Sequence, residues 1–588
     1  MMKFAFLALL PVMAAAEQPV RIIALGDSNT ATRGTINVYA NRLQEALLDV
    51  RVANAGIGGH DTNMALLRLH KDVLSQKPDI VTIMFGINDA AVDVWKDPPA
   101  SKPRVPLYIY EANLRHFVRM CRRVGATPIL MTPTPLRWSE KTLKLYGKAP
   151  YKPDEAEGFN VLLPAYADSV RRIAKEEKAR LFDAWAAFNK PEGGPEKLLL
   201  TDGMHLNDAG HELIAKSLLP LIRGALANPL PKPEPIAEVK GWTDDKDIWY
   251  PHFAKPLDVA SHSTGPFVRM GDSEIGTAHH AGLFISQDRG KTWTRTATIG
   301  SQKQPVQLRG ERTMLKTTSG VLILAYLNTR DPNTHWKWNN VKNAPAPGTR
   351  RDTWVSRSLD DGATWEEPQH VIESYSGAVR DIVQMKSGRI VLAGMEINMK
   401  AARHMTTMFV SDDDGATWKR GDTLDIGGRG HHDGSIEPTL AELKDGRLWM
   451  LLRTNLGCFY ESFSTDGLTW SPMKATKIGA SSAPAMVSRL DSGRLVLIWN
   501  DVYPQGETNF VRSDKLHSER PASWQRGELL IAFSEDEGQT WTKPAIIARK
   551  PKAWLSYPYV FEPVPGELWI TTMQTGVRAK VFEKDLVN

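Results

Sequence analysis

The spacing of hydrophobic residues changes in character partway along the chain. In residues 20–226, short apolar runs typical of buried strands alternate with longer stretches in which apolar residues recur every three or four positions, as in amphipathic helices. The strand-like runs lie at residues 20–25, 51–54, 79–85 and 127–131. This alternation predicts a parallel sheet covered by helices on both faces, with functional residues beyond the carboxyl ends of the strands.

A proline-rich segment ends this region. In residues 228–235 every second residue is proline, which prevents a helix and favours an extended spacer. Beyond it the pattern changes to short strands, Gly-Arg and Asp-Gly turns, and most of the tryptophans. We therefore expect a first domain at 17–226, a linker at 227–240 and an all-β second domain at 241–588.

Five segments of the second domain share the pattern Ser-x-Asp-x-Gly-x-Thr-Trp. They begin at Ser286, Ser358, Ser411, Ser464 and Ser534, and the fourth is one residue shorter. Each predicts a tight hairpin turn, because Asp caps backbone N–H groups, Gly takes a positive φ and Trp packs against the sheet. Repeats of about 50 residues that hold several short strands predict propeller blades. Strand groups near residues 266, 311, 379, 436, 484 and 557 predict six blades.

Charge and the first residues narrow the class of protein. The 588 residues carry a formal charge of only +6 and no long basic run, which argues against nucleic acid as a partner. Lys3, the apolar stretch 4–13 and the alanines at 14–16 predict a cleaved signal peptide at 1–16 and a secreted or periplasmic protein. That stretch is too short to span a bilayer, and no later segment is apolar for about twenty residues, so we expect no stable membrane span. A retained anchor is the alternative.

The two cysteines, Cys121 and Cys458, lie in different domains. They do not form a disulfide framework, and we expect both to be buried structural thiols.

The first domain contains the residues of a serine esterase. Ser28 lies where the first strand ends, a position at which we expect a helix to begin. Asp202 precedes His205 by three residues, so that it can orient the ring that takes the proton from Ser28. The Ser28 N–H, a glycine N–H from residues 56–61 and the Asn88 amide can stabilise the oxyanion.

These segments together resemble the SGNH (GDSL) hydrolase family. The resemblance rests on Gly-Asp-Ser at 26–28, the glycine-rich turn 54–62, Gly-Ile-Asn-Asp at 86–89 and Asp-x-x-His at 202–205. It implies a flavodoxin-like three-layer α/β sandwich and ester hydrolysis without metal. Ser28 would be the nucleophile, His205 the base and Asp202 its orienter. Gly59, preferred to Gly58, would complete the oxyanion hole with Asn88. Each motif alone is a common turn, cap or surface pair, but the four occur in order on strand ends.

The five repeats of the second domain resemble the Asp-box (BNR) repeats of sialidases, which are folding devices on blade edges. A sialidase holds its substrate's carboxylate with three arginines and uses a tyrosine nucleophile helped by a glutamate. The resemblance implies Tyr557 as the nucleophile, Glu437 as the base, and Arg312, Arg453 and Arg526 as substrate-binding residues. The alternative is that the arginines form surface pairs while Tyr557 fills a blade interior.

Two departures from the sialidase pattern stand out. An acid/base aspartate has no clear counterpart, because neither Asp331 nor Asp352 fits well. The last strand, predicted at 567–572, lacks the glutamate that would steady the first arginine, and Gln574 is a poor substitute.

The pair His431-His432 suggests metal ligands, but adjacent histidines point apart in most backbones, so we expect a loop role. Neither proposed mechanism needs a metal or an organic cofactor, because both use side chains alone.

We therefore interpret the chain as a secreted carbohydrate-processing hydrolase. A serine esterase, by hypothesis a sialate O-acetylesterase, would be coupled to a sialidase-like exo-glycosidase domain, and the substrate would be an acylated glycan or sialoglycan. A second hypothesis makes the propeller a non-catalytic glycan-binding module beside an esterase for another acetylated polysaccharide. A third assigns lipid or thioester substrates to the esterase. The sequence indicates no oligomeric state.

Overall fold

The computed structural model describes residues 19–190, 194–234, 239–259, 264–280, 282–300, 305–509 and 517–587. The chain forms two compact units, residues 1–234 and residues 235–588. The predicted signal peptide and residues 235–238 of the predicted linker lie outside the described residues.

The first unit is built on one five-stranded parallel sheet. The strands are β1 (Val20–Gly26), β2 (Val50–Gly56), β3 (Ile80–Met84), β4 (Thr127–Met131) and β5 (Arg180–Phe182). Their order, β2-β1-β3-β4-β5, is that of flavodoxin-like sheets, so the predicted fold class is confirmed. The sequence prediction missed β5, because three residues beginning with arginine give no periodic signal.

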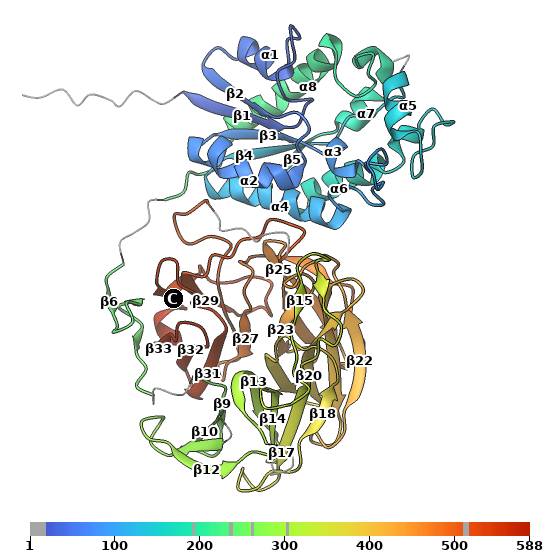
Figure 1. The fold of residues 1–588 in the computed structure, drawn as a ribbon. Coiled ribbons are helices and arrows are strands. Elements are labelled where there is room, and N and C mark those ends of the chain that lie inside the picture. Colours follow the sequence, from blue (N-terminus) through green and yellow to red (C-terminus); the bar gives the residue numbers. More distant parts are fainter. Residues whose placement is uncertain are drawn as a thin grey trace, which may run out of the picture. The chain divides into compact units, whose positions relative to one another are not determined.

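Helices cover both faces of this sheet. They are α1 (Tyr39–Ala46), α2 (Thr62–Asp72), α3 (Ile87–Ala90), α4 (Leu107–Arg123), α5 (Glu140–Tyr146), α6 (Leu163–Glu176), α7 (Ala184–Phe188) and α8 (Asp208–Ala227). In Figure 1, α1 and α8 lie on one face of the sheet, and α2, α4 and α6 lie on the other. The apolar side chains of β1, β3 and β4 are buried between these layers, which fixes the strand ends on which the functional loops stand.

Two glycines bring these loops close together. A Cβ on Gly26 would lie 2.1 Å from Thr30 Oγ1, and one on Gly56 would lie 2.2 Å from the Ala31 nitrogen. The chain after β1 forms a tight turn, in which Thr30 and Ala31 both donate to the Asp27 carbonyl. The sequence prediction of a helix at this point is therefore wrong, because α1 begins only at Tyr39.

In its described residues, the second unit contains six larger antiparallel sheets and one two-stranded sheet. In sheet order they are β9–β12 (Phe267–Arg269, Ile275–His279, Gly282–Ser286, Thr294–Thr298), then β13, β14, β17 and β18 (Leu308–Lys316, Leu322–Asn328, Thr353–Ser358, Gln369–Ile372), and β19–β22 (Asp381–Gln384, Ile390–Asn398, Arg403–Ser411, Lys419–Leu424). The others are β23–β26 (Ile436–Glu442, Leu448–Arg453, Cys458–Ser464, Lys474–Gly479), β27–β30 (Met486–Arg489, Leu495–Trp499, Glu528–Ser534, Ala545–Arg549) and β31–β33 (Pro558–Val564, Glu567–Thr572, Arg578–Phe582). A separate hairpin joins β15 (Trp338–Asn339) to β16 (Ala344–Pro345).

The six sheets close into a ring. The first strand of each sheet contacts the first strand of the next, in the order β9, β13, β19, β23, β27, β31, and β31 contacts β9 again. The predicted six-bladed propeller is thereby confirmed. Three short strands before the first blade complete the last two, since β8 (Lys255–Pro256) pairs with β33, while β7 (Trp249–Pro251) pairs with β30 and with β6 (Gly241–Thr243).

The repeated Asp boxes join the third and fourth strands of the first five blades. In the third box, Ser411 Oγ donates to Asp413 Oδ1 at 2.7 Å and accepts from the Gly415 N–H at 2.8 Å. Asp413 also accepts from the N–H and the hydroxyl of Thr417, at 2.8 and 2.6 Å. Gly415 takes a φ of +79°, a conformation that favours glycine. Each box is thus a self-contained turn on a blade edge.

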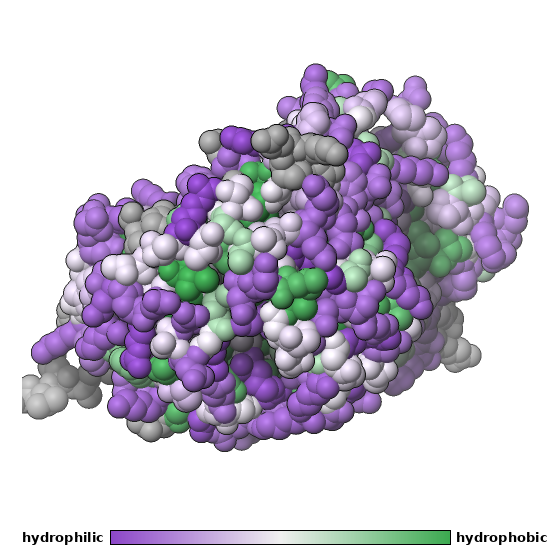
Figure 2. Space-filling model, turned by 90° about the horizontal axis from the view of Figure 1, so that it is seen from below, coloured by the Kyte–Doolittle hydropathy of each residue, from purple (hydrophilic) through white to green (hydrophobic). Residues whose placement is uncertain are grey.

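Other sequence expectations concern burial and the surface. Cys121 and Cys458 are both free and buried, as predicted. No helix among the described residues has the length and apolar character needed to cross a membrane. Figure 2 shows a face on which hydrophilic residues predominate and apolar residues form small separate groups.

Candidate functional site

Three side chains form a hydrogen-bonded chain beyond the carboxyl end of β1. The Nε2 atom of His205 lies 3.0 Å from the Oγ atom of Ser28. The Nδ1 atom of the same ring lies 2.6 Å from Asp202 Oδ2. Ser28 is partly exposed in the turn after β1, whereas Asp202 and His205 lie in the loop before α8. The structure therefore brings together a hydroxyl, a base and a carboxylate from segments 177 residues apart.

The carboxylate of Asp202 is held by its own loop. Its Oδ1 atom accepts from the N–H groups of Met204 and His205, both at 3.0 Å. Burial by itself would raise the pKa of Asp202, but the bonds from the His205 ring and from these two N–H groups outweigh it, so the pKa lies below its usual value. Asp202 is thus a charged acceptor that fixes the His205 ring.

Asn29 ties the serine turn to the histidine loop. Its Nδ2 donates to the Met204 carbonyl and its Oδ1 accepts from the Leu206 N–H, both at 3.2 Å. These bonds hold the backbone on both sides of His205. The sequence analysis did not single out Asn29, because its partners are about 175 residues away and no local motif indicates them.

The glycine-rich turn lies beside the same serine, and Asn88 is bonded to that turn. A Cβ on Gly58 would be 3.9 Å from the Ser28 Cβ, and Gly59, the next residue, takes a φ of +76°. The Asn88 amide donates to the His60 carbonyl at 3.1 Å, and its oxygen accepts from Arg104 at 3.1 Å. Among the described residues the Asn88 amide nitrogen donates only to His60, so its second hydrogen can bind a ligand.

Arg104 is a further residue that sequence reasoning missed. Its guanidinium forms a bidentate pair with Asp93, at distances of 2.7 to 3.1 Å, and from this anchor it orients the Asn88 side chain. The sequence analysis gave no signal for this contact, because Arg104 follows Asn88 in an irregular segment.

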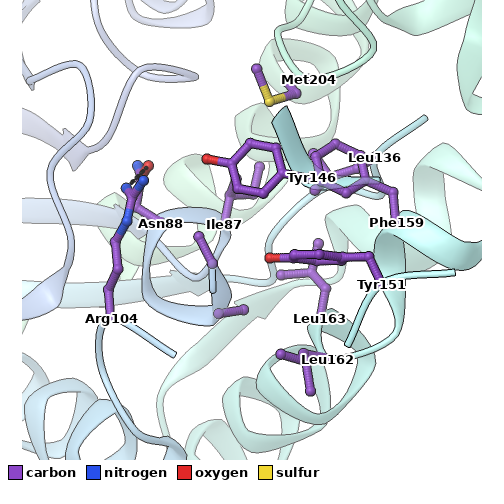
Figure 3. A pocket seen from close by; sticks show the side chains of 12 residues that line it. Ile87, Asn88, Arg104, Leu136, Tyr146, Tyr151, Phe159, Leu162, Leu163 and Met204 are labelled. Carbon is purple, nitrogen blue, oxygen red and sulfur yellow. Dashed lines mark hydrogen bonds between the residues drawn. The ribbon is translucent and has the colours of Figure 1, made fainter. Parts of the chain in front are cut away.

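A small aromatic pocket of about 50 Å³ opens next to Asn88 (Figure 3). Tyr146, Tyr151 and Phe159 point into it, and Met204, which precedes His205, lies at its edge. Arg104 is the charged residue of the lining. Such a mixture of aromatic faces with a few polar groups is typical of small-ligand sites.

The arrangement in the first unit can perform acyl transfer. The serine hydroxyl contacts an imidazole, and the same imidazole contacts a carboxylate. This is the geometry of an activated nucleophile. Backbone N–H groups and an amide on one side of the serine can stabilise a developing oxyanion.

A second polar cluster lies at the centre of the propeller. Tyr557 OH donates to Glu437 Oε1 at 2.8 Å, and Arg453 donates to Glu437 Oε2 at 2.5 Å. Burial would raise the pKa of Glu437, but the charge of Arg453 outweighs it and lowers the pKa. Tyr557 and Glu437 have φ angles of +62° and +48°. Positive φ is costly for such side chains and is concentrated at functional sites.

Arg526 approaches the same cluster from the fifth blade. It donates to the Ser482 carbonyl and, at 3.2 Å, to Gln574, and its guanidinium lies 4.5 Å from the Trp554 ring centroid. Gln574 therefore supports Arg526 and not the first predicted arginine. The structure thus brings Tyr557, Glu437, Arg453 and Arg526 together.

The prediction for Arg312 is wrong. Its guanidinium donates to the carbonyls of Ala278, Gly310 and Gly265, because successive residues of a strand point to opposite sides and its neighbour Glu311 faces the centre.

Arg380, from the third blade, lies at the centre in place of Arg312. It lies 3.8 Å from Glu311 and 5.3 Å from the Tyr557 ring centroid. Burial raises the pKa of Glu311 to about 7.

The two aspartates considered as acid/base lie elsewhere in the second blade. Asp352 pairs with Arg350 at 2.6 Å, and Asp331 accepts from the Trp354 indole at 3.3 Å. Their carboxylates lie beside His370. In the part of the chain that the structure describes, neither forms a hydrogen bond or ion pair with Tyr557.

The expectation that His431 and His432 point apart is also wrong. Their ring centroids lie 4.4 Å apart, and both rings lie beside His517. The loop folds back on itself, because the Asp433 carboxylate accepts from the Arg429 N–H at 3.0 Å.

Comparison with known families divides the chain in the same way. Residues 24–213 match the model of the GDSL-like Lipase/Acylhydrolase family. Residues 283–570 match the model of the BNR repeat-like domain.

Individual relatives match one unit at a time. The acetylxylan esterase of Geobacillus stearothermophilus is 33% identical over 176 residues, which are 29% of this chain and 72% of that protein. An isoamyl acetate-hydrolyzing esterase 1 homolog of Bos taurus is 32% identical over 213 residues, 34% of this chain and 81% of its own. Among solved structures, the Hadza microbial sialidase Hz136 is 17% identical, with a TM-score of 0.39, over 55% of this chain and 67% of that chain.

Proposed function

The chain belongs to the GDSL-like lipase/acylhydrolase family, and a BNR repeat-like domain follows the esterase domain in the sequence. We therefore propose that the protein removes acetyl groups from glycans with Ser28 as the nucleophile. That it is a hydrolase acting on ester bonds follows from the family. The observation that carries the proposal is the unbroken contact from Ser28 through His205 to Asp202.

The reaction takes two steps. Ser28 Oγ attacks the ester carbonyl while His205 Nε2 accepts its proton. His205 then gives the proton to the sugar oxygen as the ester C–O bond breaks, which releases the sugar as an alcohol and leaves acetyl-serine. Water, deprotonated by His205, hydrolyses the acetyl-serine and releases acetate. Gly59 N–H, Ser28 N–H and the free hydrogen of Asn88 stabilise the oxyanion in both steps.

The relatives and the pocket favour a short acyl group on a sugar. The names of the two enzymes compared above refer to acetyl esters, one of them on xylan. Tyr151 and Phe159 are buried in the pocket lining and Tyr146 is half-buried, so the pocket offers an apolar wall for a short acyl group. A long lipid chain would need more apolar volume than this pocket provides.

Acetate release tests the proposal. The full chain is incubated with an O-acetylated sialoside and with acetylated xylan, and acetate is measured for the wild type, Ser28→Ala and the exposed control Ser75→Ala. Ser28→Ala should lose at least about a thousandfold in kcat while Ser75→Ala stays at the wild-type rate. The faster of the two substrates identifies the glycan. Full acetate release by Ser28→Ala would refute the proposal.

For the second unit we propose cleavage of the sialoside itself. The observation that favours it is Tyr557 bonded to Glu437 and bracketed by Arg453 and Arg526. Glu437 would take the phenolic proton as Tyr557 attacks the anomeric carbon. The arginines would pair with the substrate carboxylate, with Arg380 as a third cation in the absence of Arg312.

The alternative is a propeller that only binds an acidic glycan. It is favoured because, among the described residues, neither Asp331 nor Asp352 bonds to Tyr557. Sugar release from an aryl sialoside distinguishes the two. Release by the wild type that is lost in Tyr557→Phe supports cleavage. Glycan binding without release, unchanged in Tyr557→Phe, supports a binding module.

We also propose that the chain is exported, on the strength of the basic, apolar and small-residue segments in residues 1–16. Expression in a bacterium followed by amino-terminal sequencing should find mature protein beginning at Glu17. Intact Met1 on all of the protein would contradict export by cleavage.

A further inference from the structure

Three histidines from two distant loops of the second unit meet in space. His431 and His432 lie in the loop before β23, and His517 lies in the long loop between β28 and β29. One ring nitrogen from each lies within 4.8 Å of the others. The His432 and His517 rings are stacked, with ring centroids 5.1 Å apart and an angle of 8° between the ring planes. The centroid of the His431 ring lies 4.2 Å from that of His517.

A buried carboxylate locks the two loops together. Asp433 accepts from the Ser518 hydroxyl and the Glu519 N–H, both at 2.9 Å. The His432 N–H also donates to the His517 carbonyl at 3.1 Å. The three imidazoles are thus presented by backbone that is fixed on both sides, which is how ligand geometry is preorganised.

Trp524 packs against two of the rings. Its indole stands edge-on to His432 and to His517, at 5.1 Å from each and at 85° and 86°. The rings therefore share one side of the cluster with an apolar wall, as metal-bound imidazoles commonly do.

We propose that His431, His432 and His517 bind a borderline divalent metal ion, with zinc as the representative. Imidazole nitrogens suit zinc and its neighbours and not calcium or magnesium. Three protein ligands with a fourth position for water or another oxygen is a common zinc arrangement. Ligand atoms around tetrahedral zinc lie about 3.4 Å apart, and the lone pair of each imidazole lies in the plane of its ring. Metal binding would therefore turn the His432 and His517 rings out of their parallel stack and bring the nitrogens roughly an ångström closer through side-chain rotation.

The second group of possible ligands, Asp331, Asp352 and His370, fits less well. Arg350 contacts both oxygens of the Asp352 carboxylate, at 2.6 to 3.0 Å. A metal there would have to displace a bidentate ion pair. In the described part of the chain, the His432 side chain forms no ion pair that a metal would have to displace.

Metal binding would steady the centre of the propeller. The loop that carries His517 continues through Trp524 to Arg526. Asn455 donates to the His432 carbonyl at 2.9 Å and accepts from Ser482 Oγ, which in turn accepts from Arg453 at 3.0 Å. The metal would thus fix the supports of both arginines, whatever ligand they bind.

Zinc titration of the full chain tests the site. Protein stripped by a chelator and dialysed is titrated with zinc chloride, and separately with calcium chloride, by isothermal calorimetry. We expect one zinc ion per chain and no calcium binding. His432→Ala and His517→Ala should each weaken zinc binding at least about tenfold, while the exposed control His252→Ala should leave it unchanged.

Two further measurements keep the result decisive. If His432→Ala fails to fold by near-ultraviolet circular dichroism, His517→Gln replaces it, because the backbone bonds of residue 517 are retained. Zinc binding that persists in the His517 variants would overturn the proposal. Zinc binding that is lost in His370→Ala but retained in His432→Ala would also overturn it, because the ion would then lie at the aspartate cluster.

Discussion

At the scale of single residues, the esterase centre depends on contacts that span the sequence. The sequence motif identified Ser28, Asp202, His205 and Asn88, because each carries chemistry that is recognisable locally. Asn29 escaped notice, since its role arises only when the loop around His205 folds onto it. Its side chain bonds to backbone atoms on both sides of His205, so we expect it to act by positioning.

Replacing Asn29 should therefore slow the reaction without weakening binding. Asn29→Ala frees the backbone on both sides of His205, and a displacement of about 1 Å of a catalytic group can cost about a hundredfold in rate. We expect kcat for an aryl acetate to fall by ten- to a hundredfold, with KM within about twofold. The exposed control Asn189→Ala should match the wild type, and an Asn29→Ala defect confined to KM would contradict a positioning role.

Asp89, next to Asn88, predicts a pH dependence of stability. Burial raises its pKa to about 7, although its bonds to the N–H and hydroxyl of Thr62 lower it. The folded state therefore holds the proton more tightly than the unfolded state, whose pKa is near 3.8. The contribution of Asp89 to the stability of the first unit must fall as the pH rises from about 4 to about 7, and the loss persists above that pH.

Asp89→Asn removes this titration while Asn Oδ1 can still accept from Thr62. Denaturant unfolding at pH 4 and pH 8 should show that the variant loses less stability between these values than the wild type does, by up to about 4 kcal/mol. Burial also raises the pKa of Asp27 to about 7. Asp27 therefore keeps its own contribution to the pH dependence of stability in the variant. Equal slopes for wild type and variant would disprove a buried titrating Asp89.

At the scale of elements, repeated and strongly periodic segments were predictable and short or folded-back ones were not. Strands β1 to β4 and the six inner strands of the propeller match the runs seen in the sequence. Strand β5 was too short to show a period. The helix expected at Ser28 does not form there, because Thr30 and Ala31 instead close a turn onto Asp27.

The Asp boxes stabilise the turns at the blade edges. Ser411 is buried and both donates to Asp413 and accepts from Gly415. Ser411→Ala leaves a buried N–H without its acceptor, which costs about 1–3 kcal/mol. We expect that loss of stability in chemical unfolding of the propeller, and less than about 0.5 kcal/mol for the exposed Ser387→Ala in the same blade. A neutral Ser411→Ala would show that the box does not stabilise the fold.

At the scale of the whole molecule, the two units have separate cores and separate sites. The number of blades followed from the six strand groups, but the strands β6 to β8, two or three residues each, gave no signal. They nevertheless complete the last two blades, and Tyr250 in β7 is fully buried among residues of both. The propeller therefore depends on the residues that directly follow the linker.

Tyr250→Ala should damage one unit and spare the other. Truncating a buried aromatic side chain costs about 3–5 kcal/mol, so the propeller transition in calorimetry should move to lower temperature. Aryl acetate hydrolysis by the first unit should keep its wild-type rate. A parallel loss of esterase activity at a temperature where the propeller is folded would show that the units are not independent.

Covalent labelling tests the central claim, that Ser28 is the nucleophile of an esterase, most directly. An organophosphonate ester is added to the full chain, and mass spectrometry of the peptides locates the adduct. We predict a single adduct on Ser28, loss of acetate release in proportion to labelling, and no adduct in His205→Ala, where the base is missing. An adduct on a different residue, or full activity with Ser28 labelled, would contradict the account.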